Sequence, residues 1–196
     1  MTFSSFMAIL ISSILIENYI FSRFLGICPF LGLSEKPSTA IGMGCAVTFV
    51  MTVSSAVTWC VYHFLLVPFE LEYLKTIAFI LIIASLVQLI EMFLKKSVPS
   101  LYTALGIYLP LITTNCAILG AALLCIQNDY NLITSIVFSF GSAIGWTLAI
   151  VIFAGVRARV AFADTPKCFK GTPIALVTAC LIALAFAGFQ GDELPF

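Results

Sequence analysis

The chain has 196 residues, of which 62% are hydrophobic and only 9% are charged, and its formal net charge at pH 7 is zero. Soluble domains carry about 25% charged residues, so this composition excludes a water-facing globular surface and predicts a protein dissolved in lipid. The neutral balance, without any cluster of basic residues, also excludes nucleic-acid binding.

Uncharged stretches between isolated charged residues mark the expected membrane crossings. A spanning helix needs about 20 residues at a rise of about 1.5 Å each. Six stretches meet or approach this length. We therefore predict an all-α membrane protein with six transmembrane helices, near residues 3–22, 39–64, 74–94, 101–125, 131–156 and 172–190.

The six predicted spans divide into two blocks of three. We treat 1–196 as one integral membrane domain built from two repeats of about 1–95 and 96–196. A repeat with an odd number of spans inserts its second copy upside down, which predicts two inverted three-helix repeats. A weak sequence echo supports the repeat, because Thr39-Ala40-Ile41 and Thr134-Ser135-Ile136 are each followed by glycines. Small residues alone are common in packed membrane helices.

Two cysteines, Cys28 and Cys116, occupy matching positions in the two halves. Each is followed four residues later by a glycine, Gly32 and Gly120, and 116 − 28 and 120 − 32 both give 88. Thiolate is a soft ligand that binds iron and other transition metals. The matched pair therefore indicates a metal site better than it indicates two independent packing residues.

Both cysteines lie in segments whose sequence predicts broken or half helices. Phe24–Leu33 is apolar but too short to cross a membrane and contains Pro29, whereas residues 97–128 exceed one crossing and contain Pro110. Proline removes a backbone donor and crowds the preceding turn. Irregular backbone at membrane depth is tolerated only where protein buries it or water fills a cavity. Paired breaks in an inverted repeat predict a binding site near the membrane midplane.

A free cysteine is more often a small apolar packing residue than a ligand. A disulfide between Cys28 and Cys116 is a further alternative, which reducing conditions on the cytoplasmic side disfavour. An iron–sulfur cluster takes four protein ligands, so two thiolates make half a site and a second polypeptide or a second copy must complete it. We interpret the remaining cysteines as packing residues: Cys45, Cys60, Cys125, Cys168 and Cys180.

Four polar residues near these segments are further candidates. Thr114 and Asn115 either donate hydrogen bonds to the sulfurs or cap a broken helix, and the two roles are compatible. Glu17 and Glu91 are acids within or near spans, and intramembrane acids are candidates for an ion path. Glu91 also lies four residues before Lys95, the spacing of a surface ion pair on a helix.

Several segments resemble a known membrane-protein family over nearly the whole chain. They are Phe24–Phe30, Thr39–Gly44, Gln88–Met92, Leu109–Ala117 and Pro166–Gly171. The chain is similar to the paired membrane subunits shared by the Rnf complex and the sodium-pumping NADH:quinone oxidoreductase, and most similar to the A-subunit family of Rnf. The string Leu-Pro-Leu-Ile-Thr-Thr-Asn-Cys at 109–116 is specific to this resemblance.

The resemblance implies a heterodimer with the homologous E subunit of Rnf. It implies a [2Fe–2S] cluster at the membrane centre, with Cys28 and Cys116 as ligands from this chain and two cysteines from the partner. The complex would pass electrons between ferredoxin and NAD, coupled to Na⁺ or H⁺ movement. Flavins and the other iron–sulfur clusters would belong to the B, C, D and G subunits, so no catalysis is expected from this chain alone.

One departure from the family pattern concerns the choice between the two complexes. Glu17-Asn18 stands where many A subunits have two asparagines, and an acid there is more similar to the quinone-linked relative. The alternatives are therefore a subunit of the quinone-linked complex, a non-redox inverted-repeat transporter that uses the Thr-Asn run for binding, and a structural scaffold.

Lysine and arginine predict the orientation of the chain in a bacterial cytoplasmic (inner) membrane. With six spans, eight of the nine basic residues lie on one side and only Lys75 lies on the other. Such an excess marks the cytoplasmic face. The eight are Arg23, Lys36, Lys95, Lys96, Arg157, Arg159, Lys167 and Lys170.

Both termini are therefore expected on the non-cytoplasmic side. Alkaline phosphatase fused after Phe196 should be active, and a fluorescent protein fused there should stay dark. A fluorescent fusion with inactive phosphatase would contradict the six-span orientation.

Overall fold

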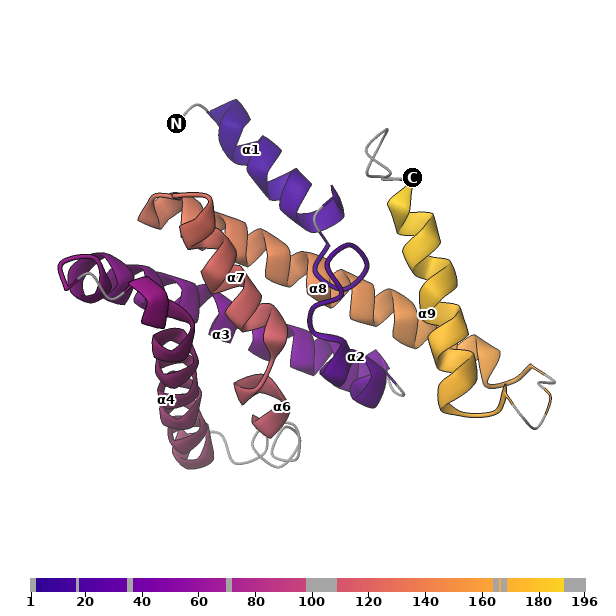
Figure 1. Cartoon of the computed structure of the whole chain (residues 1–196). Coiled ribbons are helices and arrows are strands. Elements are labelled where there is room, and N and C mark those ends of the chain that lie inside the picture. Colours follow the sequence, from indigo (N-terminus) through magenta and orange to yellow (C-terminus); the bar gives the residue numbers. More distant parts are fainter. Residues whose placement is uncertain are drawn as a thin grey trace.

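The computed structural model describes residues 3–16, 18–34, 37–69, 72–97, 109–163, 166 and 169–188. Within these ranges every regular element is a helix, which confirms the all-α class (Figure 1). The elements are α1 (Phe3–Ile11), the π-helix η1 (Ser12–Ile16), α2 (Ile27–Leu33), α3 (Pro37–Val61), the π-helix η2 (Tyr62–Leu66), the 3₁₀-helix η3 (Glu72–Leu74), α4 (Lys75–Ser97), α6 (Leu109–Thr113), α7 (Cys116–Gln127), α8 (Leu132–Val160) and α9 (Thr172–Ala187).

Within the described ranges, four helical segments are long and apolar enough to cross a membrane, and they overlap the second to fifth predicted spans. They are Pro37–Leu66, Lys75–Met92, Pro110–Gln127 and Leu132–Val160. Residues 101–108 of the fourth predicted span lie outside the described residues. The first and last predicted spans correspond to shorter apolar helices, Phe6–Ile16 and Thr172–Ala187. The 16 residues of α9 extend about 24 Å, slightly less than a hydrocarbon core of about 30 Å.

The first predicted span, 3–22, is too long because the helix stops at Ile16. The side chain of Asn18 takes over hydrogen bonds there: its Nδ2 donates to the Gly145 carbonyl at 2.9 Å, and its Oδ1 accepts from Ile20 N–H at 3.1 Å. Asn side chains that bond their own backbone compete with the helix in this way. The sequence predicted a break after Arg23, in Phe24–Leu33. The structure shows that the break begins before Arg23.

Helices α3 and α8 form the centre of the bundle and lie side by side in Figure 1. They are in close contact where Gly44 faces Thr147, because a Cβ on Gly44 would overlap the Thr147 side chain and lie 3.0 Å from its Cβ. Close contact through glycine is typical of membrane helices, which gain from packing and little from water exclusion. Helix α7 packs against both α3 and α8.

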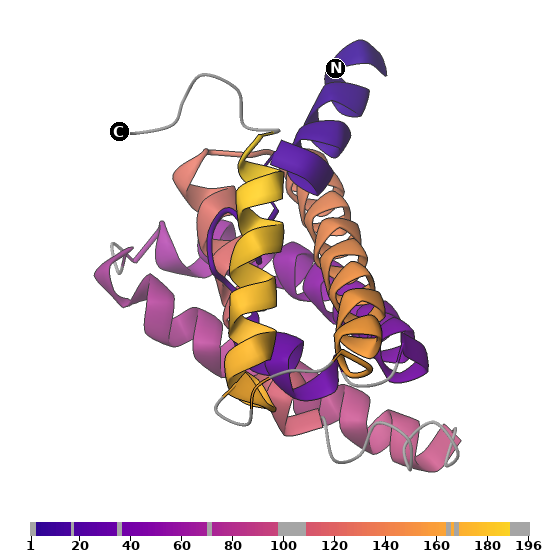
Figure 2. The same cartoon turned by 90° about the vertical axis from the view of Figure 1, so that its right-hand side faces the viewer.

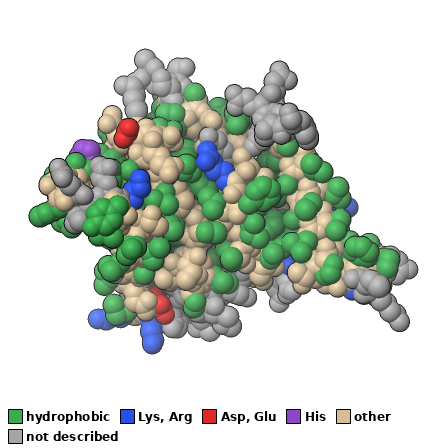
Figure 3. All heavy atoms as spheres, in the orientation of Figure 1, with side chains coloured by type: hydrophobic (Ala, Val, Ile, Leu, Met, Phe, Trp, Pro, Cys, Tyr) green, Lys and Arg blue, Asp and Glu red, His purple; other side chains and the backbone are tan. Residues whose placement is uncertain are grey.

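The N-terminal helix packs on α8 and projects from one end of the bundle (Figures 1 and 2). The contact again uses glycine, because a Cβ on Gly145 would lie 2.7 Å from the Ile14 carbonyl oxygen. Hydrophobic side chains cover much of the face in Figure 3, among few charged side chains, as expected of a surface that meets lipid or another membrane protein.

The order of elements is the same in the two halves of the chain. A short helix that carries the matched cysteine is followed by a long central helix and then by a further apolar helix: α2, α3 and α4 in the first half, and α7, α8 and α9 in the second. This order agrees with a three-helix repeat. The inverted relation of the two copies stays a prediction.

Replacing Gly44 by alanine should destabilise the protein, because the added Cβ forces α3 and α8 apart. Overpacking of this kind costs about 1–3 kcal/mol. Gly42 on the same helix is the matched control, because a Cβ there meets no atom within 4 Å. Gly44→Ala should lower the melting temperature of the detergent-purified protein, whereas Gly42→Ala should leave it unchanged or raise it slightly. Equal melting temperatures for the two variants would contradict the close α3–α8 contact.

Candidate metal centre

Both predicted ligands lie in the first turn of a helix that follows a break. Cys28 is the second residue of α2, after Gly26 at the N-cap, and Cys116 is the first residue of α7, after Asn115 at the N-cap. The predicted half-helices that carry the two cysteines are therefore present. The first break occupies the segment between η1 and α2, and the second comprises Thr114 and Asn115.

The structure brings the two breaks into direct contact. The backbone N–H of Gly26 donates to Cys116 Sγ, with 2.9 Å between nitrogen and sulfur. Gly26 has φ +80°, a left-handed conformation that favours glycine. A Cβ at this position would overlap Trp146 Nε1 and lie 3.2 Å from the Ala117 Cβ. The Gly26 N–H is thus held toward the sulfur by a backbone that has no room for a side chain.

This junction lies next to the middle of the long helix α8. That helix runs from Leu132 to Val160, so Trp146 has 14 residues on either side of it. Helix α7 leads from Cys116 through 12 residues, about 18 Å, to an exposed turn at Asn128 and Asp129. These lengths are compatible with a junction near half depth in a hydrocarbon core of about 30 Å, and that depth stays a prediction.

Neither candidate thiol is buried inside the chain. Cys28 is exposed and Cys116 is half-buried, and both are free. Cys125, by contrast, is 2% exposed and packs in the core as predicted. The same prediction is wrong for Cys45 and Cys180, which are exposed on the outside of the bundle.

Two further cysteines complete this comparison. Cys60 is half-buried, and Cys168 lies outside the described residues.

Thr114 and Asn115 both cap the second break. Thr114 Oγ1 donates to the Pro110 carbonyl at 2.9 Å, and Asn115 Oδ1 accepts from Ala117 N–H at 3.0 Å. Asn115 is 3% exposed, and its Nδ2 has no hydrogen-bond partner among the residues that the structure describes. That amide is a spare donor one residue before Cys116. The capping role is confirmed, and donation to sulfur stays a prediction.

Of the two acids predicted for an ion path, the structure describes Glu91. Glu17 falls outside the described residues. Glu91 lies near the end of α4, where its Oε2 accepts from Gln88 Nε2 at 3.5 Å.

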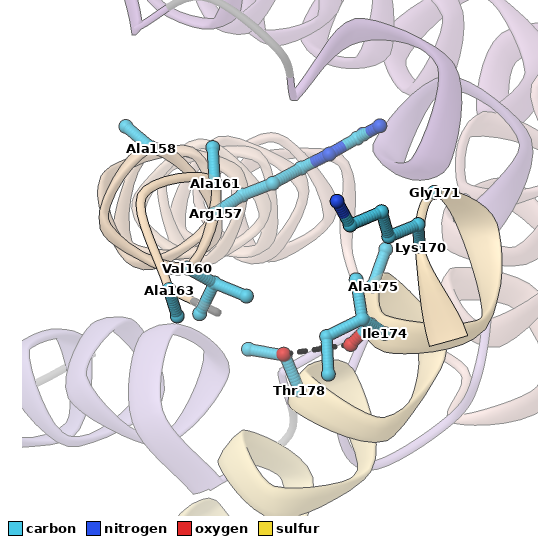
Figure 4. Close-up of a pocket in the computed structure, with 10 residues that line it drawn as sticks. All are labelled: Arg157, Ala158, Val160, Ala161, Ala163, Lys170, Gly171, Ile174, Ala175 and Thr178. Carbon is cyan, nitrogen blue, oxygen red and sulfur yellow. Dashed lines mark hydrogen bonds between the residues drawn. The ribbon is translucent and has the colours of Figure 1, made fainter. Parts of the chain in front are cut away.

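Arg157 holds the other end of the short helix that carries Cys28. Its Nη1 donates to the Leu31 carbonyl and to Ser34 Oγ, both at 2.9 Å. A cation at the C-terminal end of a helix satisfies free carbonyls and complements the helix dipole. Arg157 and Lys170 also line a pocket of about 470 Å³ between the end of α8 and the start of α9 (Figure 4). Sequence reasoning gave Arg157 a role at the cytoplasmic surface and missed this contact.

Arg23 lies beside α7. It lines a surface pocket with Leu25, Gly120, Leu124 and Gln127. The segment curls back on itself here, because Leu25 N–H donates to the Tyr19 carbonyl at 2.7 Å. The side of the membrane on which Arg23 lies stays a prediction.

The residues present fit half of a thiolate-ligated metal site. Cys28 and Cys116 start two helices on the outside of the chain, and the Gly26 N–H already donates to one sulfur. No group of three or more His, Cys, Asp or Glu side chains capable of holding a metal occurs within the described ranges. The donor set is thus two thiols, which a second polypeptide would have to extend to four for an iron–sulfur cluster.

These features define a multi-pass helical membrane protein in which each of two helix breaks is followed by a cysteine. A family model described as "Rnf-Nqr subunit, membrane protein" matches residues 6–191. The chain belongs to the Rnf-Nqr family.

Curated relatives are similar to this chain over almost its whole length. The A subunit of the Na⁺-translocating ferredoxin:NAD⁺ oxidoreductase complex from Acetobacterium woodii is 61% identical over 95% of this chain and 97% of its own length. The A subunit of the ion-translocating oxidoreductase complex from Syntrophotalea carbinolica is 58% identical, over 93% of this chain and 95% of its own length. The protein of the same name in Azoarcus sp. is 51% identical, over 96% of this chain and 97% of its own length.

Replacing Asn18 by alanine should destabilise the first break by about 1–3 kcal/mol, because Ile20 N–H and the Gly145 carbonyl lose a buried partner. Asn131→Ala is the control, because Asn131 is an exposed N-cap whose side chain makes no capping hydrogen bond. Thermal unfolding of both variants in detergent should show a lower midpoint for Asn18→Ala alone. An equal decrease of the unfolding midpoint in Asn131→Ala would contradict a specific stabilising role of the Asn18 side chain.

Proposed function

We propose that this chain is the membrane subunit of an Rnf-type, ion-translocating ferredoxin:NAD⁺ oxidoreductase and carries electrons through the membrane. Cys28 and Cys116 bind a [2Fe–2S] cluster together with two cysteines of a partner subunit. The observation that carries this proposal is the contact of the two cysteine-bearing breaks beside the middle of α8. The names of the most similar relatives support the reaction class.

Geometry explains why such a chain is needed. An electron cannot cross about 30 Å of hydrocarbon in one useful step, so a stopping point near half depth divides the distance. When bound, the cluster supplies a one-electron redox centre whose potential depends on burial and on hydrogen bonds to its sulfurs. The chain contributes the Gly26 N–H as one such donor, and the Nδ2 of Asn115 is available as a second.

The partner in this proposal is the homologous E subunit. Two thiols at the chain surface support it, because a four-ligand centre closes only when a second protein covers them. The reactions with ferredoxin and NAD belong to other subunits, B, C, D and G, which carry the flavins and remaining clusters. Translocation of Na⁺ or H⁺ is a property of the assembled complex in the bacterial cytoplasmic membrane, and Glu17 and Glu91 are proposed members of the ion path.

Single substitutions of the two ligands should remove the cluster and leave the complex assembled. We expect Cys28→Ser and Cys116→Ser to abolish the iron, acid-labile sulfide, visible absorption and paramagnetic signal of the purified heterodimer. Cys45→Ser is the control, because this thiol is also exposed but lines a pocket between α3 and α8 that includes no residue of either break. Wild-type iron content in both ligand variants, or equal loss in the control, would reject the assignment.

A further inference from the structure

A basic pocket lies between the end of α8 and the start of α9, outside the candidate metal centre. Its volume is about 470 Å³, within the range of about 300–1,000 Å³ that small-molecule pockets occupy. Two of the described residues that line it are basic, Arg157 and Lys170, and none of them is acidic. We call this cavity the α8–α9 pocket.

The two cations reach the α8–α9 pocket from different helices. Arg157 belongs to α8, whereas Lys170 immediately precedes the N-cap of α9, and in Figure 4 both side chains point into the same space. Like charges that face one cavity repel each other, and an anion placed between them is attracted by both. The charge of the pocket therefore selects an anionic ligand.

The guanidinium of Arg157 is held at the pocket before any ligand binds. Its Nη1 donates to the Leu31 carbonyl and to Ser34 Oγ, both at 2.9 Å. A group that is already fixed loses little conformational entropy on binding, which favours recognition. Arginine also suits phosphate in particular, because its planar fork of N–H donors matches the oxygens of that group.

The α8–α9 pocket lies at the level expected of lipid headgroups. Helix α8 has 29 residues and extends about 43 Å, the thickness of a bilayer that includes its headgroup regions. Arg157 is 11 residues from the middle of this helix at Trp146, about 16 Å along the axis. In a bilayer centred on α8, Arg157 thus lies at the edge of the hydrocarbon core, whose half-thickness is about 15 Å.

The wall of the pocket is apolar next to its charges. Val160 at the end of α8 and Ile174 and Ala175 in the first turn of α9 line it together with the two basic residues. A free phosphate ion would use only the charged part of this lining. A phospholipid would use both parts, because its phosphate is joined through glycerol to apolar chains.

We propose that the α8–α9 pocket binds the headgroup of an anionic phospholipid. Arg157 and Lys170 contact the phosphate, and Val160 and Ile174 contact the first carbons of the acyl chains. Basic pockets between transmembrane helices on the cytoplasmic side typically bind anionic headgroups, and both basic residues are predicted on that side. Because Arg157 also bonds to the Leu31 carbonyl, the lipid lies beside the end of the helix that carries Cys28. This site goes beyond the proposed function and does not require a cluster.

Photocrosslinking in lipid tests the site directly. The purified complex would be placed in phosphatidylcholine nanodiscs that contain a little phosphatidylglycerol with a photoreactive diazirine near one acyl ester. After illumination and chymotrypsin digestion, mass spectrometry would quantify the label on the end of α8 and the start of α9. Lys170→Gln should lower this labelling at least fivefold, because the phosphate loses a cation, and Lys170→Arg should stay within twofold of wild type.

Lys96→Gln is the matched control. Lys96 is also an exposed lysine with a predicted cytoplasmic position, but it lies in the last turn of α4 and does not line the pocket. This variant should label within twofold of wild type. Unlabelled phosphatidylglycerol added to the nanodiscs should lower the wild-type labelling at least fivefold, whereas a large excess of inorganic phosphate in the buffer should leave it within twofold.

Equal labelling of wild type and Lys170→Gln, or an equal loss in Lys96→Gln, would overturn the proposal. Equal labelling by a phosphatidylcholine with the same diazirine would overturn the selectivity for an anionic lipid. Displacement by inorganic phosphate would assign the pocket to a free anion and overturn the lipid. None of these measurements depends on iron, so a complex that lacks iron but labels as expected would refute the cluster alone.

Discussion

A helix that stops inside a bilayer exposes amide and carbonyl groups that lipid cannot hydrate. This constraint governs the centre of the molecule, because both cysteines follow such stops. Each break contains a buried asparagine, and the solution is the same: Asn18 Oδ1 accepts from Ile20 N–H, and Asn115 Oδ1 accepts from Ala117 N–H, two residues on in each case. One amide freed by each break is thus satisfied locally, whereas the Gly26 N–H is directed at a sulfur.

Because backbone groups at the breaks are hydrogen-bonded, the cysteines can follow these breaks without local unfolding of the chain. Arg157 fixes one end of α2 and the Gly26–Cys116 contact fixes the other, so the position of Cys28 is set by the bundle. A site that is completed by a second protein needs this rigidity. Ligands that are held before the partner arrives lose little conformational entropy on binding.

Part of this arrangement could be read from the sequence. The prolines and the Thr-Asn run locate the second break, because these residue types disturb a helix wherever they lie, and the matched cysteines give both candidate ligands. The end of the first helix could not be located in the same way. Asn18 breaks the helix through a bond to Gly145, 127 residues away, and no local pattern encodes that distance.

Other features of the site depend equally on packing. Gly26 is critical because Trp146 occupies the space of its side chain. A charge count assumes that a segment continues across the membrane, whereas the segment that carries Arg23 curls back on itself.

Hydrogen bonds between the two halves also determine when the first break can reach its folded structure during synthesis. Asn18 bonds to Gly145, Gly26 to Cys116, and the carbonyl of Leu31 to Arg157. The first break is therefore incomplete when the ribosome has made only the first half. Until nearly 160 residues have been translated, the partners that Asn18, Gly26 and Leu31 have in the folded chain are not all present. Helix α8 supplies Gly145 and Arg157, so the contacts of Asn18 and Leu31 form only after this helix has been synthesised.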